Sequence, residues 1–401
     1  MRKKTNRLLL FLFILLPFMS AGQIRHQHDS IMELVSEAPS DSLRALQYLE
    51  LGDLYLETNQ DTAIHYHEQA FGIARDKEHT ALAGKCLNYI AIAYIYQSDY
   101  DKTIDYLQRS IDYKERASDS GGLANAYNNL GIIYKNQGDY EMALEYLTQT
   151  ARIRKAMSNG QDDSVQRLNN IEKLGHVYNN QGNIYYQFGD YARAISYYNK
   201  SLEHYEKVGY SRGISACYNN IGSVFEEQEN FDKALEYYER ALKLNRDLGI
   251  DRNVGTCLNN IGEVHLKSNQ LARARKYFEE SLDYRTKAND KRGISAVYSN
   301  LAMVNMKTGR YETSLDQLYK ALKLDNEMGD KKAMSEDLVY LAEVYLHQGE
   351  VRQAIDFARQ GKALADSIEA PLQKKSSLEI LARSYEKQRS EEHTSELQSL
   401  L

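Results

Sequence analysis

Tryptophan is absent from this 401-residue sequence, and proline occurs only three times. Because proline interrupts helices, its scarcity favours long helices. No apolar run reaches the roughly 20 residues that a membrane-spanning helix needs. Basic residues are not in excess either: 50 Lys and Arg stand against 56 Asp and Glu, for a formal net charge of −6. The sequence therefore lacks the basic surface that nucleic-acid binding requires.

Motifs for catalysis and for cofactor binding are also missing. The sequence holds no glycine-rich phosphate loop, no Gly-x-Ser-x-Gly elbow and no His-Glu-x-x-His. The paired histidines, His26 with His28 and His65 with His67, are two positions apart, and a helix would point such side chains to different faces. We therefore expect neither an enzyme nor a protein that holds a metal or a cofactor.

Both ends of the chain differ from its middle. Residues 1–22 are typical of a secretory signal, with a basic start, an apolar run and a small-residue cleavage site at Ser20-Ala21-Gly22. Because the apolar run is short for a membrane anchor, we expect export to the periplasm or to the extracytoplasmic face of the inner membrane. Residues 389–399 resemble the translation of a sequencing adapter, so we expect 389–401 to be a non-native tail.

A unit of about 40 residues recurs along the rest of the chain. Each unit centres on a small residue, here called the anchor, and the anchors are Gly52, Ala91, Gly131, Gly182, Gly222, Gly262, Ala302, Ala342 and Ala382. The spacings between them are 39, 40, 51, 40, 40, 40, 40 and 40 residues. A glycine often follows seven residues later, then an aromatic residue, and a small residue stands twelve after the anchor. This order predicts a helix, a turn and a second helix in every unit.

The unit around the anchor Gly131 shows nearly the complete pattern, with Leu130-Gly131, Tyr134, Gly138, Tyr140, Ala143 and Leu147. In these residues the chain resembles the tetratricopeptide repeat (TPR) family, in a subgroup with long, 40-residue repeats. The resemblance implies an all-α, right-handed superhelical solenoid of antiparallel helix pairs that binds proteins. We accordingly expect a signal peptide (1–22), a helical lead-in (23–39) and a solenoid (40–388) of eight repeats with a truncated ninth.

Two irregularities interrupt the period. The spacing of 51 adds eleven residues, which advance a helix by about 1100°, close to three full turns. We therefore expect longer helices around residues 163–180 and not an extra loop. In the ninth unit the register requires glycine at position 389, where Arg389 stands. We expect the native reading frame to continue differently after Gln388.

The three cysteines, Cys86, Cys217 and Cys257, each stand five residues before an anchor. Neighbouring helices pack 8–10 Å apart, which exceeds the roughly 7 Å between Cα atoms that a disulfide spans. We expect small buried residues and no bridge.

Asparagine recurs two residues before the anchor in five successive units, although it is a poor helix former. The five residues are Asn129, Asn180, Asn220, Asn260 and Asn300. One interpretation, which the resemblance to the tetratricopeptide family implies, is a ladder in the concave groove that holds the main chain of a bound peptide, since an amide both donates and accepts hydrogen bonds. The other is that the amides join neighbouring helices and tie the repeats together.

These observations predict an extracytoplasmic protein that binds a peptide or protein segment of unknown identity in its groove. One alternative is the sensory region of a truncated membrane-bound signalling protein, such as a histidine kinase or transcriptional regulator, anchored in the membrane through a missing C-terminal part. Another is a structural assembly scaffold.

Overall fold

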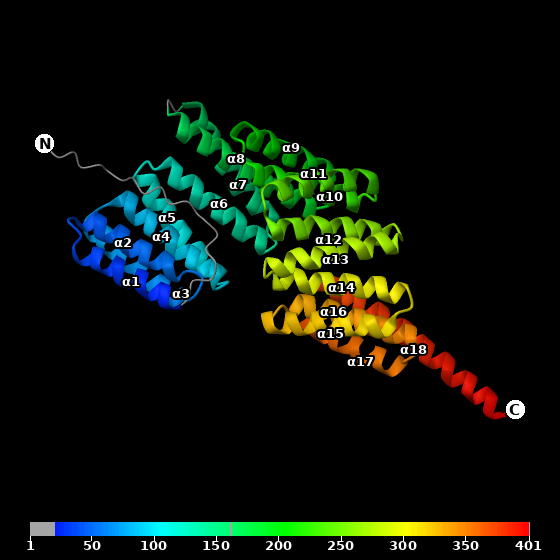
Figure 1. Cartoon of the computed structure of the whole chain (residues 1–401). Helices are drawn as coiled ribbons and strands as arrows, with labels where there is room; N and C mark the ends of the chain where they lie inside the picture. Colours follow the sequence, from blue (N-terminus) through cyan, green and yellow to red (C-terminus); the bar gives the residue numbers. More distant parts are fainter. Residues whose placement is uncertain (1–20, 161–162, 401) are drawn as a thin grey trace. The chain divides into compact units, whose positions relative to one another are not determined.

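The computed structural model describes residues 21–160 and 163–400, and every regular element in this part of the chain is an α-helix (Figure 1). The helices are α1 (Ala21–Ser36), α2 (Asp41–Tyr55), α3 (Gln60–Asp76), α4 (Thr80–Tyr96), α5 (Tyr100–Arg116), α6 (Ser120–Asn136), α7 (Tyr140–Gly160), α8 (Ser164–Gln187), α9 (Tyr191–Val208), α10 (Ser211–Glu227), α11 (Phe231–Asp247), α12 (Asp251–Lys267), α13 (Leu271–Lys287), α14 (Lys291–Lys307), α15 (Tyr311–Met328), α16 (Lys331–Gln348), α17 (Val351–Ser367) and α18 (Pro371–Leu400). The predicted all-α fold is confirmed.

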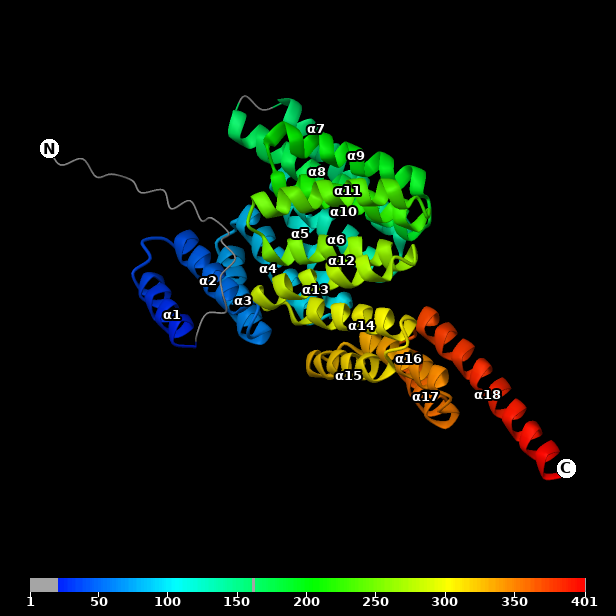
Figure 2. The ribbon, with the colours of Figure 1, turned by 45° about the vertical axis from the view of Figure 1, so that its right-hand side comes forward.

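The helices alternate between two roles. The even-numbered helices from α2 to α18 hold the anchors, and we call them the first helices; the odd-numbered helices from α3 to α17 are the second helices. Within each unit, helices that follow one another pack together, as α4 with α5 and α12 with α13, and they lie side by side in both ribbon views (Figures 1 and 2). First helices also contact each other, as α10 with α12, α12 with α14, and α14 with α16. The predicted solenoid of helix pairs is therefore confirmed.

The chain divides into two compact units, one ending at Ile184 and the other starting at Tyr185. In the first unit the helix pairs α2–α3, α4–α5 and α6–α7 follow one another, with α1 packed on α2. In the second unit the pairs run from α10–α11 to α16–α17, and α18 packs on α16 and α17.

The turn between the two helices of a repeat places the residue seven after the anchor in the left-handed region. The predicted glycine stops all lie there, Gly138 at a φ of 82°, Gly189 at 72°, Gly309 at 73° and Gly349 at 85°. Without a Cβ atom, glycine adopts this conformation at no steric cost. The next residue commonly caps the second helix, as Asp190 does by accepting a hydrogen bond from the backbone N–H of Arg193.

The small anchors allow the second helix to approach closely. A Cβ atom placed on Gly222 would lie 2.7 Å from the ring of Tyr238, and one placed on Gly262 would lie 2.6 Å from the ring of Phe278. Both rings are fully buried. The bulky residue sixteen positions after the anchor thus fills the space that the anchor leaves empty.

A buried hydroxyl joins the two helices in six of the described repeats. Each lies 2.6–3.5 Å from the backbone carbonyl oxygen of a residue 26 positions away; the hydroxyls belong to Ser110, Thr150, Ser215, Ser281, Ser295 and Ser335. Because a buried polar group must find a partner, this pairing fixes the register of the second helix on the first.

The extra eleven residues lengthen two helices, as expected from the sequence. Helix α7 has 21 residues and α8 has 24, against 17 in α4, α5 and α6. At the chain ends, residues 1–20 of the proposed signal peptide lie outside the described residues, and α1 begins at Ala21. Helix α18 continues from Pro371 through the proposed tail to Leu400.

Candidate functional site

The five asparagines of the proposed ladder lie on five successive first helices, α6, α8, α10, α12 and α14, at the same register. Asn129 and Asn180 belong to the first unit, and Asn220, Asn260 and Asn300 belong to the second. All five side chains are half-buried. Within each unit the structure thus places them on the array of first helices, as the sequence predicts.

Three of these amides form hydrogen bonds to the first helix of the preceding repeat. The Nδ2 atom of Asn129 donates to Oδ1 of Asn88 at 3.3 Å, and Nδ2 of Asn260 donates to Oδ1 of Asn219 at 2.9 Å. Nδ2 of Asn300 donates to Oδ1 of Asn259 at 3.0 Å. The amides therefore do tie neighbouring repeats together.

The same three amides keep an unused acceptor. The Oδ1 atoms of Asn129, Asn260 and Asn300 accept no hydrogen bond from any residue that the structure describes. An amide oxygen has two lone pairs and readily accepts from an N–H group. Bonding between repeats and bonding to a ligand are therefore compatible, because the first uses the nitrogen and the second would use the oxygen.

A carboxylate completes the network in the second unit. Glu263, one residue after its anchor, accepts from Nδ2 of Asn259 at 2.7 Å and from Nδ2 of Asn300 at 2.9 Å. Burial raises the pKa of this carboxyl, and the nearby charge of Glu226 raises it further, while the two amide hydrogen bonds act in the opposite direction. Asn300 thus uses its nitrogen fully and offers only its oxygen to a ligand.

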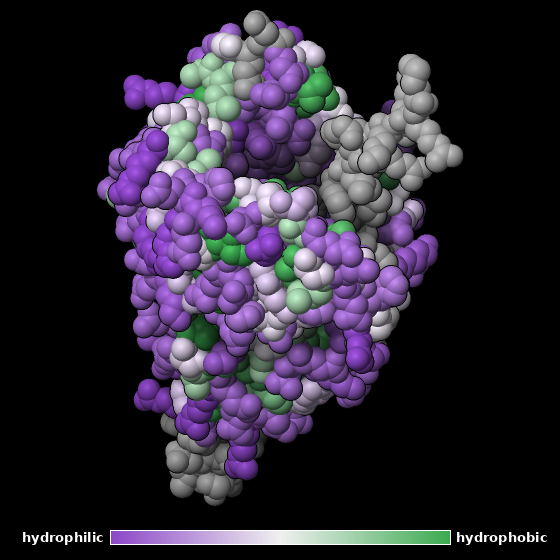
Figure 3. Space-filling view, turned by 90° about the vertical axis from the view of Figure 1, so that its left-hand side faces the viewer, coloured by the Kyte–Doolittle hydropathy of each residue, from purple (hydrophilic) through white to green (hydrophobic). Residues whose placement is uncertain are grey.

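Negative charge surrounds the first helices of the second unit. Glu226, which is 7% exposed, accepts from the hydroxyl of Tyr238 at 2.7 Å and pairs with Lys267 at 2.8 Å. Burial raises the pKa of Tyr186 to about 12, and the charges of Glu227, Glu226 and Glu263 contribute. Burial likewise raises the pKa of Tyr340 to about 12, with contributions from Glu336 and Glu343 among others. Figure 3 shows mainly hydrophilic residues on the face that it draws, with only scattered hydrophobic ones.

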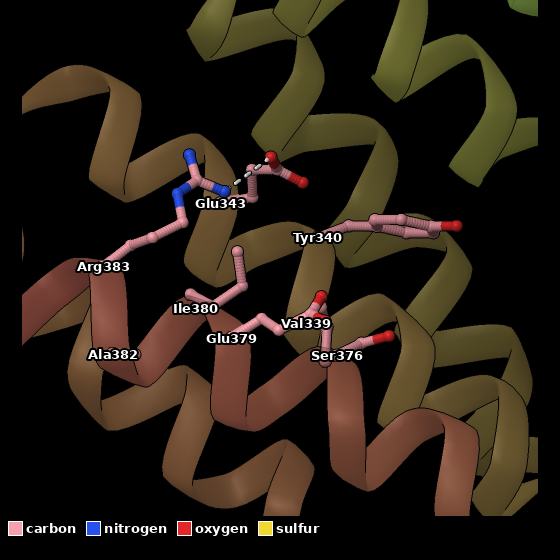
Figure 4. Close-up of a pocket in the computed structure, with 8 residues that line it drawn as sticks. All are labelled: Val339, Tyr340, Glu343, Ser376, Glu379, Ile380, Ala382 and Arg383. Atoms are coloured by element: carbon pink, nitrogen blue, oxygen red, sulfur yellow. Dashed lines mark hydrogen bonds and ion pairs between the residues drawn. The ribbon is translucent and has the colours of Figure 1, made fainter.

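Beyond Asn300 the asparagine register changes character. Tyr340 and Ile380 occupy it in the next two repeats, and both line a hollow between α16 and α18 (Figure 4). Arg383 of α18 reaches toward Glu343 of α16, and their side chains pair at 3.3 Å, while the Tyr340 ring points away from them. The amide ladder therefore ends at Asn300, and an aromatic and aliphatic surface follows it.

The three cysteines and His67 are buried. Cys86, Cys217 and Cys257 are buried and unbridged, and burial raises the pKa of the Cys86 thiol to about 12. His67 is fully buried against Gly52, and its Nε2 lies 3.5 Å from Asp53. Among residues 21–160 and 163–400, no group of three or more potential ligands could hold a metal ion. No helix within the same ranges has the length and apolar character of a membrane span.

Sequence reasoning missed the residues that the ladder bonds to. Asn219 and Asn259 are each the first member of an Asn-Asn doublet, and only the second member was singled out. The recurrence of the doublet itself was the available signal, since one asparagine would bond back along the solenoid and the other forward. Glu263 carried no such signal, because the equivalent position differs in every neighbouring repeat.

Comparison with known proteins identifies the repeat. The model of the tetratricopeptide repeat family matches residues 85–156, 173–247, 218–287 and 293–367. A search of curated proteins gave no match.

Several solved structures share the fold at low sequence identity. Aspartyl phosphate phosphatase F from Bacillus subtilis is 15% identical, with a TM-score of 0.61, over 88% of this chain and 97% of that one. A signal transduction ATPase with a tetratricopeptide repeat sensor, from Pyrococcus horikoshii, is 15% identical, with a TM-score of 0.58, over 89% of this chain and 54% of that one. A Rap protein complexed with competence and sporulation factor is 14% identical, with a TM-score of 0.52, over 92% of this chain and 100% of that one.

Proposed function

Because the chain belongs to the tetratricopeptide repeat family, we propose that it binds an extended peptide or protein segment across the face of its first helices. The proposal rests on half-buried asparagines whose Oδ1 atoms accept no hydrogen bond from any residue that the structure describes, seen at Asn129, Asn260 and Asn300. Asn180 and Asn220 occupy the same register on α8 and α10. Within each unit, amides that share one register suit the main chain of a ligand, which repeats regularly whatever its side chains are.

The spacing of the repeats suits an extended ligand. Neighbouring first helices pack about 8–10 Å apart, and three residues of a polyproline II segment advance about 9 Å. A ligand in this conformation would present one backbone N–H to the amide oxygen of each successive helix. Such a bond counts most where water is excluded, because an unpaired amide oxygen there costs about 1–3 kcal/mol.

The structural neighbours support a binding role and do not define the ligand. The Rap protein was solved with competence and sporulation factor bound, and the Pyrococcus protein carries its repeats as a sensor. At 14–15% identity these likenesses concern the fold alone. We therefore propose binding without catalysis, although one neighbour is an aspartyl phosphate phosphatase.

We further propose that the protein acts outside the cytoplasm, on the strength of the signal-like residues 1–22. Mass spectrometry of the protein purified from its own cells tests this part. A mature N-terminus near Gln23 supports export, and an intact Met1 in periplasm-free cytoplasm contradicts it.

Selection from a random peptide display library tests the binding proposal without knowledge of the natural ligand. The full chain is immobilised, enriched peptides are synthesised, and their binding is measured by titration calorimetry. We expect enriched sequences to bind with one-to-one stoichiometry and to keep binding when single side chains are replaced by alanine. A library that yields no binder, or binders of the unfolded chain only, contradicts the proposal.

The alternative, a sensory region of a larger signalling protein, keeps the same peptide-binding face and adds an effector. The repeat sensor of the Pyrococcus signal transduction ATPase favours it. Sequencing the gene past codon 388 separates the two: a membrane span followed by an effector domain supports the sensor, and an early stop supports a free binding protein.

A further inference from the structure

Two aspartates are buried side by side where three helices meet. Asp325 lies near the end of α15 and Asp337 lies in α16, and each is only 2% exposed. Asp337 stands five residues before its anchor, the register that holds Cys217 and Cys257 in earlier repeats. A carboxyl group thus replaces a small, weakly polar side chain in the seam between repeats.

Each carboxyl has one satisfied oxygen and one without an ordinary partner. Ser295 of α14 donates its hydroxyl to Oδ2 of Asp325 at 2.8 Å, and Ser299 of α14 donates to Oδ1 of Asp337 at 2.6 Å. Oδ1 of Asp325 and Oδ2 of Asp337 are buried and receive no hydrogen bond from an amide, hydroxyl or cation. Ser295 and Ser299 stand one helical turn apart on α14, so the two carboxyl groups meet the same stretch of that helix.

A shared proton would satisfy this arrangement. Two ionised carboxylates would repel one another strongly in a site that excludes water, and neither could donate to the other. If one carboxyl keeps its proton, its O–H donates to the other, and both unpartnered oxygens are satisfied. We infer that Asp325 and Asp337 share one proton in the folded protein at neutral pH, and that losing this proton loosens the packing of α16 against α14 and α15.

The surrounding charged groups do not offset the repulsion that two ionised carboxylates would have. Among the described residues, no Lys, Arg or His nitrogen lies within 4 Å of either carboxyl. The charged and titratable groups that interact with the pair are Arg292 of α14, Asp330 just before α16, and Glu336 and Tyr340 of α16. Arg292 lowers the pKa of Asp325, but it pairs with Asp330 at 3.3 Å. The remaining neighbours are acidic, so they favour the protonated form.

The direction of the pH dependence follows from these environments. Burial raises the pKa of Asp337, and the charge of Asp325 raises it further, although the hydrogen bond from Ser299 acts in the opposite direction. Burial also raises the pKa of Asp325. An aspartate in the unfolded chain titrates near pH 4, so the folded state binds more protons above that pH. Stability contributed by the pair is therefore full below about pH 4 and falls as the pH rises through the raised folded value.

The pair is bonded to α14 next to the asparagine register. Ser299, which donates to Asp337, is the residue before Asn300 of the ladder. A change in the seam would thus alter the distance between the first helices α14 and α16. The inference about the proton does not depend on the proposed function, because it concerns the stability of the chain without any ligand.

The substitution Asp337→Asn tests the shared proton. The asparagine side chain has the shape of a protonated aspartate, and its Nδ2 can donate to Asp325 permanently. Hydrogen-exchange protection of α16, corrected for intrinsic rates, is measured on the full chain from pH 5 to pH 9. We expect the wild-type protection to fall relative to D337N by up to about tenfold per pH unit, the limit for one proton.

Two further variants and a second readout keep the test decisive. D356N removes an exposed aspartate from α17 and should follow the wild type at every pH. D325N should flatten the pH dependence as D337N does. Infrared difference spectroscopy at neutral pH should detect a carboxylic acid C=O band in the wild type that both seam variants lack. A ratio of wild-type to D337N protection that stays constant over this range, or a wild type without the acid band, would overturn the inference.

Discussion

At the scale of single residues, some turns of this solenoid hold a non-glycine residue in a strained backbone conformation, although glycine occupies the same position in other repeats. Position seven after the anchor adopts a left-handed conformation in all repeats from the second to the eighth. Glycine fills it in four of them, but Ser98, Glu229 and Asn269 fill it in the others, at φ values of 59°, 56° and 56°. For a residue with a Cβ atom this conformation costs roughly 1–2 kcal/mol, and for asparagine it costs less. These three turns are therefore sites where stability can be gained.

Replacing Glu229 by glycine should stabilise the second unit by about 1 kcal/mol, because the left-handed φ then costs nothing and only part of the gain is lost to greater freedom in the unfolded chain. Urea unfolding followed by circular dichroism measures it. N269G serves as the control and should gain less, since asparagine already tolerates the conformation. A loss of stability in E229G would show that the Glu229 side chain makes a contact more valuable than the strain.

Individual side chains also mark the limit of prediction from the sequence. The glycine stops and the asparagine register were predicted, because each recurs at fixed spacing and has one physical reason. The shared proton of Asp325 and Asp337 was not, because neither residue repeats and their proximity depends on how two helices pack. The helix-to-helix bonds of Asn260 and Asn300 were one of two interpretations that the sequence left open.

At the scale of helices, the first and second helix of a repeat pack together where the small anchor contacts the bulky residue sixteen positions later. Where the anchor is glycine the partner can be a ring, as with Gly262 and Phe278. Where the anchor is Ala302, the residue at that position is Leu318, also fully buried. The residues at the two positions thus fill one fixed volume between the helices. The sequence predicted the small anchor but not the bulky residue that packs against it.

Gly262→Ala should destabilise the protein by about 1–3 kcal/mol, because the new methyl group would overlap the Phe278 ring in a closely packed seam. The double variant G262A/F278L should recover much of this loss, since it reproduces the Ala302–Leu318 combination. Thermal unfolding of G262A, F278L and the double variant provides the comparison. If the double variant is as unstable as the sum of both single changes, the anchor and the ring do not share one space.

Helix α18 is packed on one side only. Ile380 and Leu381 are buried against the preceding pair, but Leu378 and Tyr385 are 44% and 43% exposed, and the anchor Ala382 is exposed where other anchors are covered. The predicted longer helices α7 and α8 show the contrasting case, because eleven residues kept the apolar face in register and both helices remain in the solenoid.

Hydrogen exchange in residues 371–388 should accordingly be faster than in α12 or α14, since fewer buried contacts oppose local opening of α18. Exchange mass spectrometry on the full chain at one pH gives the comparison directly. Peptides from α16, which is covered on both sides, act as the internal control. Protection of 371–388 equal to that of α14 would contradict the expectation.

At the scale of the whole molecule, the solenoid repeats one structural unit, and the residues that follow the anchors on the first helices vary from repeat to repeat. The repeats share anchors, turns and buried hydroxyls, and these explain why the fold was predictable from a single sequence. The residues after the anchors differ from repeat to repeat, from Ile132 to Glu263 and Met303. Asparagine, by contrast, recurs in five successive repeats both two and three residues before the anchor, and the first of these registers suits the main chain of a ligand.

The most direct test of peptide binding by the asparagine register is the dissociation constant of a selected peptide for two matched double variants. N260A/N300A removes two amides from first helices, and N199A/N326A removes two exposed asparagines from the second helices α9 and α15. Alanine is the better helix former, which stabilises the variant, but each substitution also removes hydrogen bonds between repeats, which destabilises it. Each effect is about 0.5–1.5 kcal/mol per site, so N260A/N300A should stay folded. We expect the dissociation constant to rise at least about tenfold for N260A/N300A and to stay within about twofold for N199A/N326A. Wild-type affinity in N260A/N300A would contradict the account.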